Sequence, residues 1–217
     1  MNRREFSAGA ACTLALASLG LPGTLLAQVK KPEEGIDYLA LDKRAPVDAA
    51  AGKIEVIEFF WYSCPHCNAF EPKLASWLKK LPADVAFRRV PVAFRDDFVP
   101  QQRLYYTLEA MGKVDELHTK VFQAIHVERQ PLDKEPAITA WAEKNGLDKS
   151  KFQELYNSFS VQTKARRGTQ LQDSYKVQGV PAMGVAGRFY TDGTLAGSMD
   201  RALQVTDYLL AEVRKVK

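Results

Sequence analysis

The chain has 217 residues, of which 46% are hydrophobic and 26% are charged, and its net charge is +4. This length and composition allow one or two domains with a buried core. The net charge is small and no block of like charges stands out. A nucleic-acid-binding face, which needs clustered Lys and Arg, is therefore not expected.

Residues 1–27 have the pattern of a secretory signal. Arg3 and Arg4 form a charged n-region, residues 8–26 are apolar or small, and Ala27 is the expected last residue before cleavage. The apolar part is short for a membrane span and contains a Pro-Gly break, which favours a cleaved signal over an uncleaved anchor. The arginine pair also resembles a twin-arginine signal, so the Sec and twin-arginine export routes both stay open.

Cleavage after Ala27 removes Cys12 and leaves Cys64 and Cys67 as the cysteines of the mature chain. An exported protein with a single cysteine pair has no disulfide framework to build. A lone pair separated by two residues is therefore more consistent with a catalytic dithiol than with a structural one.

A strand and a helix are predicted around these cysteines. Residues 54–61 form a nearly continuous apolar run, interrupted by Glu58, as expected for a strand covered on both faces. A helix is predicted over residues 64–81, with Ser63 as its N-cap and Pro65 in its first turn.

Further elements follow in chain order. A short edge strand is predicted at residues 37–41 and a second strong strand at 85–92. From residue 97 to 168 the apolar spacing becomes helical, with five helices separated by the usual stop signals. Phe159 is assigned to the fourth of these helices, and residues 161–175 to the fifth.

Strand character returns near the C-terminus. Strands are predicted at residues 180–185 and 188–190, with Ala186 and Gly187 as the turn between them. Residues 201–216 form a closing amphipathic helix. This order of elements predicts an α/β sheet interrupted by a helical insertion.

The motif Cys64-Pro65-His66-Cys67 resembles the active site of the DsbA family, periplasmic thiol oxidases of the thioredoxin superfamily. Residues 56–60 resemble the central strand of that family with its acidic residue, and Val180-Pro181 resembles its cis-proline loop. The long stretch from Cys64 to Pro181 also leaves room for the helical domain that the family inserts.

The resemblance implies a thioredoxin-like α/β fold with an inserted all-helical domain. The thioredoxin-like domain is then discontinuous, with residues 28–96 and 169–217, and the helical domain comprises residues 97–168. The likeness extends over most of residues 35–217.

Cys64 is the predicted reactive sulfur, because unpaired N–H groups and the positive end of the helix dipole favour its thiolate. Cys67, one turn further along, is expected to be shielded and to act as the resolving thiol. A substrate thiolate attacks Cys64 of the disulfide, Cys67 leaves, and a second substrate thiol then releases the oxidised substrate. The redox-active disulfide is the only redox group expected, with no other cofactor.

Half of a metal site is the alternative for the cysteine pair. It needs two more ligands, and His118 and His126 have no ligand-like spacing. No metal is therefore expected, and the two histidines are interpreted as surface or satisfied helix residues.

Pro65 and His66 complete the predicted catalytic motif. His66 is expected to add positive charge or a hydrogen-bond donor beside Cys64, which stabilises the reduced form and makes the disulfide a stronger oxidant. Glu58 is interpreted either as a buried acid that relays protons for Cys67 or as an ion-pair partner of Arg88 or Arg89, and both roles can coexist.

Val180 and Pro181 are the predicted substrate-binding residues. The family likeness implies a cis bond between them that faces the disulfide, whereas the base rate for an X–Pro bond favours an ordinary trans turn. The Val180 backbone is expected to pair with an extended substrate. Four apolar residues are interpreted as either a groove beside the site or plain core: Phe70, Leu74, Met183 and Phe189.

The resemblance implies a monomeric periplasmic thiol:disulfide oxidoreductase that gives its disulfide to reduced exported polypeptides. A DsbB-like, quinone-linked inner-membrane oxidase would reoxidise it. Two alternatives remain. One is a disulfide isomerase or reductase on the same fold, and the other is a periplasmic binding or chaperone module in which the thiols are incidental.

Overall fold

In the computed structural model, which describes residues 30–215, the predicted apolar strand is β2 (Ile54–Phe60), and all of its residues are buried. It pairs in parallel with β3 (Val85–Pro91) and antiparallel with β4 (Ala182–Val185). With β5 (Phe189–Asp192) and the short edge strand β1 (Leu39–Ala40) it forms a mixed sheet in the order β1-β5-β4-β2-β3. The sheet belongs to a compact unit that starts at Pro32.

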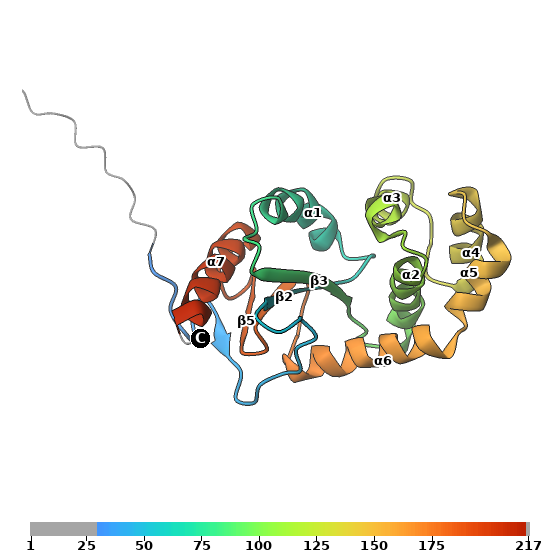
Figure 1. Ribbon diagram of the computed structural model, residues 1–217. Coiled ribbons are helices and arrows are strands. Elements are labelled where there is room, and N and C mark those ends of the chain that lie inside the picture. Colours follow the sequence, from blue (N-terminus) through green and yellow to red (C-terminus); the bar gives the residue numbers. More distant parts are fainter. Residues whose placement is uncertain (1–29, 216–217) are drawn as a thin grey trace, which may run out of the picture. The chain divides into compact units, whose positions relative to one another are not determined.

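Helices cover both faces of this sheet (Figure 1). One face packs on α1 (Pro65–Leu78) and α7 (Met199–Lys215), through a core that includes Val56 and Leu209. The opposite core includes Phe59 of β2. Alternate residues of β2 thus enter different cores, as expected for a strand covered on both sides.

The predicted helical insertion consists of a short 3-10 turn and five α-helices. Their bounds are η1 (Asp96–Phe98), α2 (Val99–Ala110), α3 (Val114–His126), α4 (Glu135–Lys144), α5 (Lys149–Tyr156) and α6 (Phe159–Ser174). Their shared core includes Leu104, Val121, Ile138 and Phe152. The boundary predicted at residue 168 falls inside α6, which continues to the sheet and contacts β3.

The assignment of Phe159 to the fourth helix is wrong. The chain leaves the helix α5 at Asn157, and the Ser158 hydroxyl accepts a hydrogen bond from the Val161 N–H at 3.2 Å. Ser158 therefore caps a new helix, and Phe159 is its first residue, with a 78% exposed side chain.

The predicted turn between the last two strands is confirmed. Ala186 and Gly187 have φ values of 54° and 67°, as a two-residue primed turn requires, and Arg188 N–H donates to the Val185 carbonyl at 2.9 Å. A Cβ atom on Gly187 would lie 2.5 Å from the Ala45 carbonyl oxygen, so the close approach of that loop also requires glycine here.

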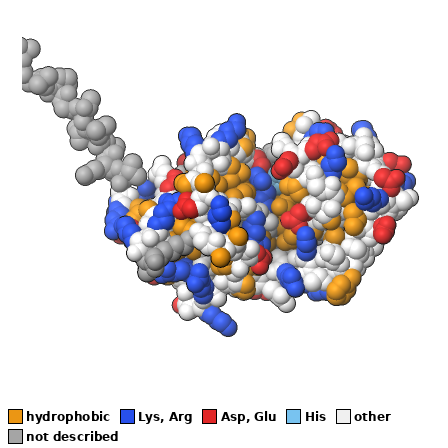
Figure 2. All heavy atoms as spheres, viewed as in Figure 1, with side chains coloured by type: hydrophobic (Ala, Val, Ile, Leu, Met, Phe, Trp, Pro, Cys, Tyr) orange, Lys and Arg blue, Asp and Glu red, His pale blue; other side chains and the backbone are white. Residues whose placement is uncertain are grey.

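Among residues 30–215, no helix has the length and apolar character needed to cross a membrane. On the face shown in Figure 2, acidic and basic side chains are interspersed over the helical part of the molecule. The predicted signal segment, residues 1–27, lies outside the described residues.

Candidate active site

The thiol motif lies where β2 leads into α1, and Cys64 itself is the N-cap of the helix. Its φ and ψ values of −80° and 117° are extended, and its Sγ atom accepts a hydrogen bond from the Cys67 N–H at 3.4 Å. Pro65 occupies the first turn, as predicted. The prediction that Ser63 caps the helix is wrong, because Ser63 is bonded to Gln101 of α2 instead.

The two thiols have different environments. Both are free, and Cys64 is 7% exposed whereas Cys67 is fully buried. Hydrogen bonding from the Cys67 thiol lowers the pKa of Cys64 to about 6; burial opposes this shift, and the backbone N–H groups of Cys67 and His66 and the charge of His66 add to it. Burial, followed by the hydrogen bond to Cys64, raises the pKa of Cys67. One sulfur is therefore stabilised as an anion and the other as a neutral thiol.

The Val180–Pro181 peptide bond is cis, as the family likeness implied. The Cys64 thiol donates to the Val180 carbonyl at 3.4 Å, so this loop lies directly against the reactive sulfur. His66 is exposed and, with this loop, lines a depression of about 360 Å³ whose other wall includes Thr194 and Met199.

Three of the four apolar residues assigned to either groove or core are buried in the core between the sheet and its helices. Phe70, Leu74 and Met183 have exposures of 2% or less. Phe189 is partly buried and packs against the same core. None of the four lines the depression beside His66.

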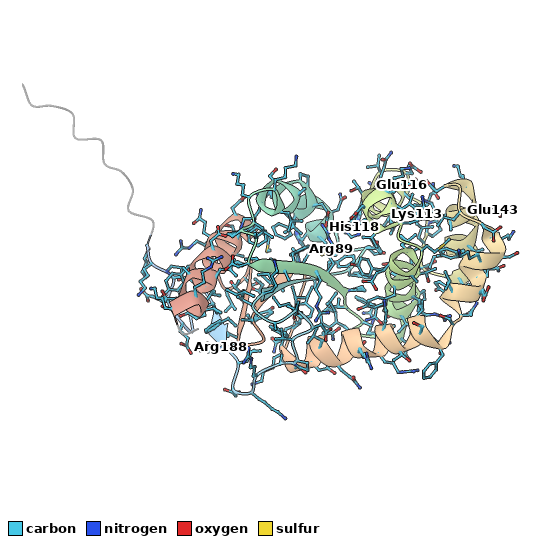
Figure 3. All side chains as sticks on the ribbon, viewed as in Figure 1. Arg89, Lys113, Glu116, His118, Glu143 and Arg188 are labelled. Carbon is cyan, nitrogen blue, oxygen red and sulfur yellow. The ribbon has the colours of Figure 1, made fainter. Side chains whose placement is uncertain are left out.

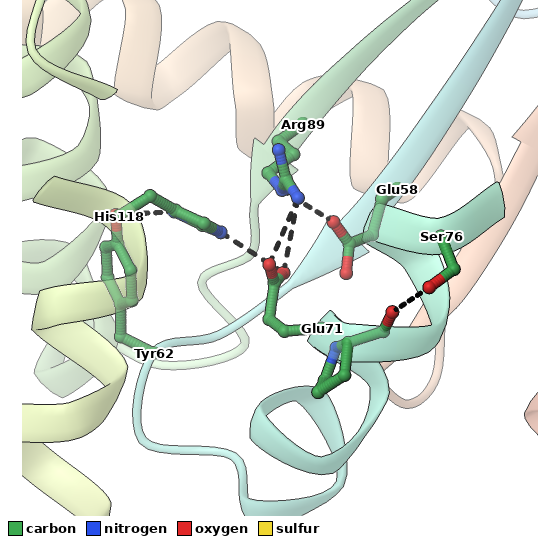
Figure 4. Close-up of polar contacts among 7 residues, drawn as sticks. Glu58, Tyr62, Glu71, Ser76, Arg89 and His118 are labelled. Carbon is green, nitrogen blue, oxygen red and sulfur yellow. Dashed lines mark hydrogen bonds and ion pairs between the residues drawn. The ribbon is translucent and has the colours of Figure 1, made fainter. Parts of the chain in front are cut away.

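Glu58 is fully buried in β2, and its ion-pair partner is Arg89 of β3, with 3.0 Å between Arg89 Nε and Glu58 Oε2 (Figure 4). Arg88 belongs to the other face of the sheet, where its Nε donates to Glu55 at 3.0 Å. Neither oxygen of Glu58 accepts a well-aligned hydrogen bond from the described part of the chain. Burial raises the pKa of Glu58 to about 8, against the charge of Arg89, and the Glu71 carboxylate adds to the rise.

Helix α3 contributes two histidines that hold the segment before Cys64. His118 Nδ1 lies 3.0 Å from the Tyr62 hydroxyl oxygen, and its Nε2 lies 3.2 Å from Glu71 Oε1. His126 Nε2 lies 2.8 Å from the Tyr62 carbonyl oxygen. Both are satisfied helix histidines, one of the two interpretations of the sequence. His118 lies on the buried apolar face of α3, between Leu117 and Val121. A histidine at such a position is the sequence feature that could have indicated a role in the site.

No cluster of three or more His, Cys, Asp or Glu side chains that could hold a metal ion occurs within residues 30–215. The chemistry of the site thus depends on two thiols with opposite proton affinities, a buried acid and a loop that faces the reactive sulfur. On the mixed sheet with its helical insertion, this arrangement defines a thiol:disulfide oxidoreductase of the thioredoxin fold.

The chain belongs to the DSBA-like thioredoxin domain family, whose model matches residues 55–204. It is 41% identical over 203 residues to the thiol:disulfide interchange protein DsbA of Burkholderia cepacia, covering 93% of this chain and 96% of the relative. It is 43% identical over 203 residues to the DsbA of Bordetella pertussis, with the same coverage.

Solved structures agree with this assignment. The crystal structure of Pseudomonas aeruginosa DsbA superposes with a TM-score of 0.79 at 40% identity, over 84% of this chain and 94% of that one. The oxidoreductase DsbA from Xylella fastidiosa gives a TM-score of 0.79 at 29% identity, over 85% and 98%. The predicted thioredoxin-like fold with a helical insertion and the predicted oxidoreductase activity are confirmed.

Proposed function

We propose that this oxidoreductase works as a disulfide donor, which transfers the Cys64–Cys67 disulfide to reduced exported polypeptides. The observation that carries this proposal is the inequality of the two thiols. The pKa of Cys64 is lowered to about 6, mainly by hydrogen bonding from Cys67, while burial raises the pKa of Cys67. A stabilised Cys64 thiolate favours the reduced protein, and a couple whose reduced form is favoured is oxidising.

The proposed exchange begins with the oxidised protein. A substrate thiolate attacks Cys64, which has the more exposed sulfur, and the disulfide electron pair leaves on Cys67. Glu58 donates a proton to the departing Cys67 thiolate, since burial raises the Glu58 pKa to about 8 and keeps the acid protonated near neutrality.

A second substrate thiolate then attacks the substrate sulfur of the mixed disulfide, and Cys64 leaves as the thiolate that its helix position stabilises. The substrate gains a disulfide and loses two electrons, which remain on the Cys64–Cys67 dithiol. The redox-active disulfide suffices for this cycle, and no other cofactor is proposed.

Substrate polypeptides are proposed to bind along Val180 and Pro181. The Val180 carbonyl lies 3.4 Å from Cys64 Sγ, so a chain that pairs with this backbone brings its own cysteine to the reactive sulfur. The depression of about 360 Å³ between His66 and Met199 offers space for a neighbouring side chain.

The proposed location is the periplasm, where the protein acts as a monomer after removal of residues 1–27. The signal pattern of those residues supports this location. A DsbB-like, quinone-linked membrane oxidase is the proposed acceptor of the two electrons. No nucleic acid and no metal take part.

The equilibrium between the purified protein and glutathione tests the proposal, together with a titration of the Cys64 thiolate by its absorbance at 240 nm. We expect a thiolate pKa well below that of an ordinary cysteine and an equilibrium that favours the reduced protein. A near-normal thiol pKa with a reducing potential would contradict the donor role and favour a reductase or isomerase.

A reduced test protein separates catalysis from simple binding. We expect the wild-type protein to oxidise it and Cys64→Ala to be inactive. If the wild-type protein prevents aggregation of the test protein but never oxidises it, and Cys64→Ala behaves in the same way, a binding or chaperone module is the correct interpretation.

A further inference from the structure

A chain of polar contacts connects helix α3 to the buried acid near Cys67. His118 is 4% exposed and lies between the Tyr62 hydroxyl, 3.0 Å from its Nδ1, and Glu71, 3.2 Å from its Nε2. Arg89 Nη2 then lies 3.1 and 3.4 Å from the two Glu71 oxygens. Arg89 Nε ends the chain at Glu58, 3.0 Å away. Figure 4 shows the His118 ring and the Arg89 guanidinium both pointing toward the Glu71 carboxylate, and Figure 3 shows His118 and Arg89 labelled between α3 and the sheet.

The direction of each hydrogen bond follows from the charges. Burial would raise the pKa of Glu71, but the hydrogen bonds from His118 and Arg89 and the charge of Arg89 outweigh it and lower that pKa, so the Glu71 carboxylate is ionised and can only accept. Burial lowers the pKa of His118, so the ring is neutral and carries one N–H. That N–H is on Nε2, facing Glu71, and Nδ1 therefore accepts from the Tyr62 hydroxyl.

The Arg89 guanidinium is shared by two buried carboxylates. Glu71 receives it through Nη2 and Glu58 through Nε. Besides burial, the charge of Glu58 in turn raises the pKa values of three neighbouring groups, which are Cys67 of α1, Tyr62 before that helix and Tyr105 of α2. Among the described residues, Arg89 is the cation in contact with Glu58, so the position of this guanidinium controls how strongly the ionised form of Glu58 is favoured.

We propose that His118 is a positioning residue of the thiol site. It holds the Glu71 carboxylate in place and thereby sets how closely Arg89 pairs with Glu71 and with Glu58. His118 touches neither thiol, and acts through Glu71 and Arg89. The consequence for turnover rests on the proposed function, in which Glu58 exchanges protons with Cys67.

Replacing His118 with Leu removes the N–H that Glu71 accepts. Glu71 stays ionised because both contacts to Arg89 remain, and it is now free to move toward that guanidinium. Arg89 is drawn away from Glu58, and the uncompensated Glu58 carboxylate becomes harder to ionise. We expect the pKa of Glu58 to rise by roughly one unit, a tenfold change in its protonation ratio.

The pKa of Glu58 can be read directly from the ¹³C carboxylate resonance of the reduced full-length mature protein. Glu71→Gln removes the Glu71 carboxyl resonance and so distinguishes it from that of Glu58. This variant is expected to lower the Glu58 pKa. Without the Glu71 charge, Arg89 serves Glu58 alone and the Glu58 pKa falls. In the Glu71→Gln background, His118→Leu should cause no further change, because the group through which His118 acts is gone.

Two variants serve as matched controls. In His118→Gln the amide can donate to Glu71 and accept from Tyr62, so we expect a Glu58 pKa close to that of the wild type. In His126→Leu a histidine of the same helix is lost, but its bond goes to the Tyr62 carbonyl and not to Glu71. This variant should leave the Glu58 pKa unchanged even where it lowers the melting temperature.

The proposal is overturned if His118→Leu leaves the Glu58 pKa unchanged or lowers it. If that variant does not fold, His118→Gln and Glu71→Gln decide, and an unmoved Glu58 pKa in Glu71→Gln overturns the proposal. The rate at which a reduced peptide is oxidised, measured against pH, gives a separate readout. A shifted Glu58 pKa with an unchanged rate profile supports the role of His118 and contradicts the proton relay by Glu58.

Discussion

Arg89 lies opposite Glu58 across the β2–β3 pair, with 3.0 Å between Arg89 Nε and Glu58 Oε2. Its neighbour Arg88 points to the other face of the sheet, where it bonds to Glu55. The alternation of side chains along β3 therefore decides which arginine reaches the buried acid. Because Arg89 also pairs with Glu71, its charge does not fully offset the effect of burial on Glu58. The pKa of Glu58 is therefore raised to about 8.

Glu58→Gln tests this buried acid through the pH dependence of stability. The folded pKa of about 8 exceeds the ordinary value of 4.5, so unfolding releases a proton between these pH values. The stabilisation is full below the unfolded pKa and is lost as the pH rises through the folded pKa. As the pH rises from about 5 to about 8, we expect the free energy of unfolding of the wild type to fall relative to that of Glu58→Gln. Urea denaturation of the reduced proteins measures this, and parallel pH curves would contradict the prediction.

His66→Ser tests the residue between the cysteines. The charge of His66 contributes to the lowered pKa of Cys64, so its loss should destabilise the Cys64 thiolate and make the disulfide less oxidising. We expect the glutathione equilibrium constant to change roughly tenfold, which is about 30 mV for two electrons. Lys73→Ser is the matched control, since Lys73 lies on the same helix but pairs with Asp200. An equal shift in both variants would remove the specific role of His66.

Gln101→Leu tests the anchoring of the segment before Cys64. Gln101 is 2% exposed, accepts from the Ser63 N–H at 3.1 Å, and donates to Ser63 Oγ at 2.7 Å and to the Leu132 carbonyl at 2.9 Å. The substitution leaves the Ser63 N–H and the Leu132 carbonyl without this partner. We expect a loss of about 1–3 kcal/mol in the free energy of unfolding.

The control for Gln101→Leu is Ser63→Ala, which keeps the bond to the backbone N–H and removes only the hydroxyl. Its effect on the free energy of unfolding should be below about 1 kcal/mol, because the Gln101 amide keeps its hydrogen bond to the Leu132 carbonyl. Equal losses in the two variants would show that the backbone bond contributes nothing.

Gly184→Ala tests the packing of β4. A Cβ atom at this position would lie 2.5 Å from a ring carbon of Tyr175, whose side chain is 1% exposed and whose hydroxyl accepts from the Gly187 N–H. We expect a loss of about 1–3 kcal/mol in chemical denaturation. Gly179→Ala is the control, because a Cβ there meets nothing within 4 Å. A neutral Gly184→Ala would mean that Tyr175 moves aside at no cost.

The sequence predicted the parts of the fold that depend on local periodicity. The apolar run of β2, the helix behind Cys64 and the change to helical spacing after residue 97 appear in the structure close to their predicted positions. The cis bond at Pro181 was implied by the family likeness alone, since nothing in the local residues distinguishes it from a trans turn.

Contacts between residues far apart in the sequence could not be predicted from local patterns. Ser63 has the composition of an N-cap, but Gln101, 38 positions away in the sequence, binds it and leaves the cap to Cys64. The sequence also left open whether Arg88 or Arg89 pairs with Glu58, because only the strand register decides it. The contact of His118 is made with Glu71, which belongs to another helix. The position of His118 in the amphipathic pattern of its own helix therefore could not identify this partner.

Helix α6 belongs to two cores at once. Val161 and Ala165, in its first half, pack into the core of the helical segment, whereas Leu171, in its second half, packs into the core beneath the sheet. At 16 residues it is a continuous rod about 24 Å long. Melting either core removes the packing that holds one half of this rod, and short helices are not stable alone in water. The helical segment and the sheet are therefore expected to unfold in a single cooperative transition, although the chain order suggests two domains.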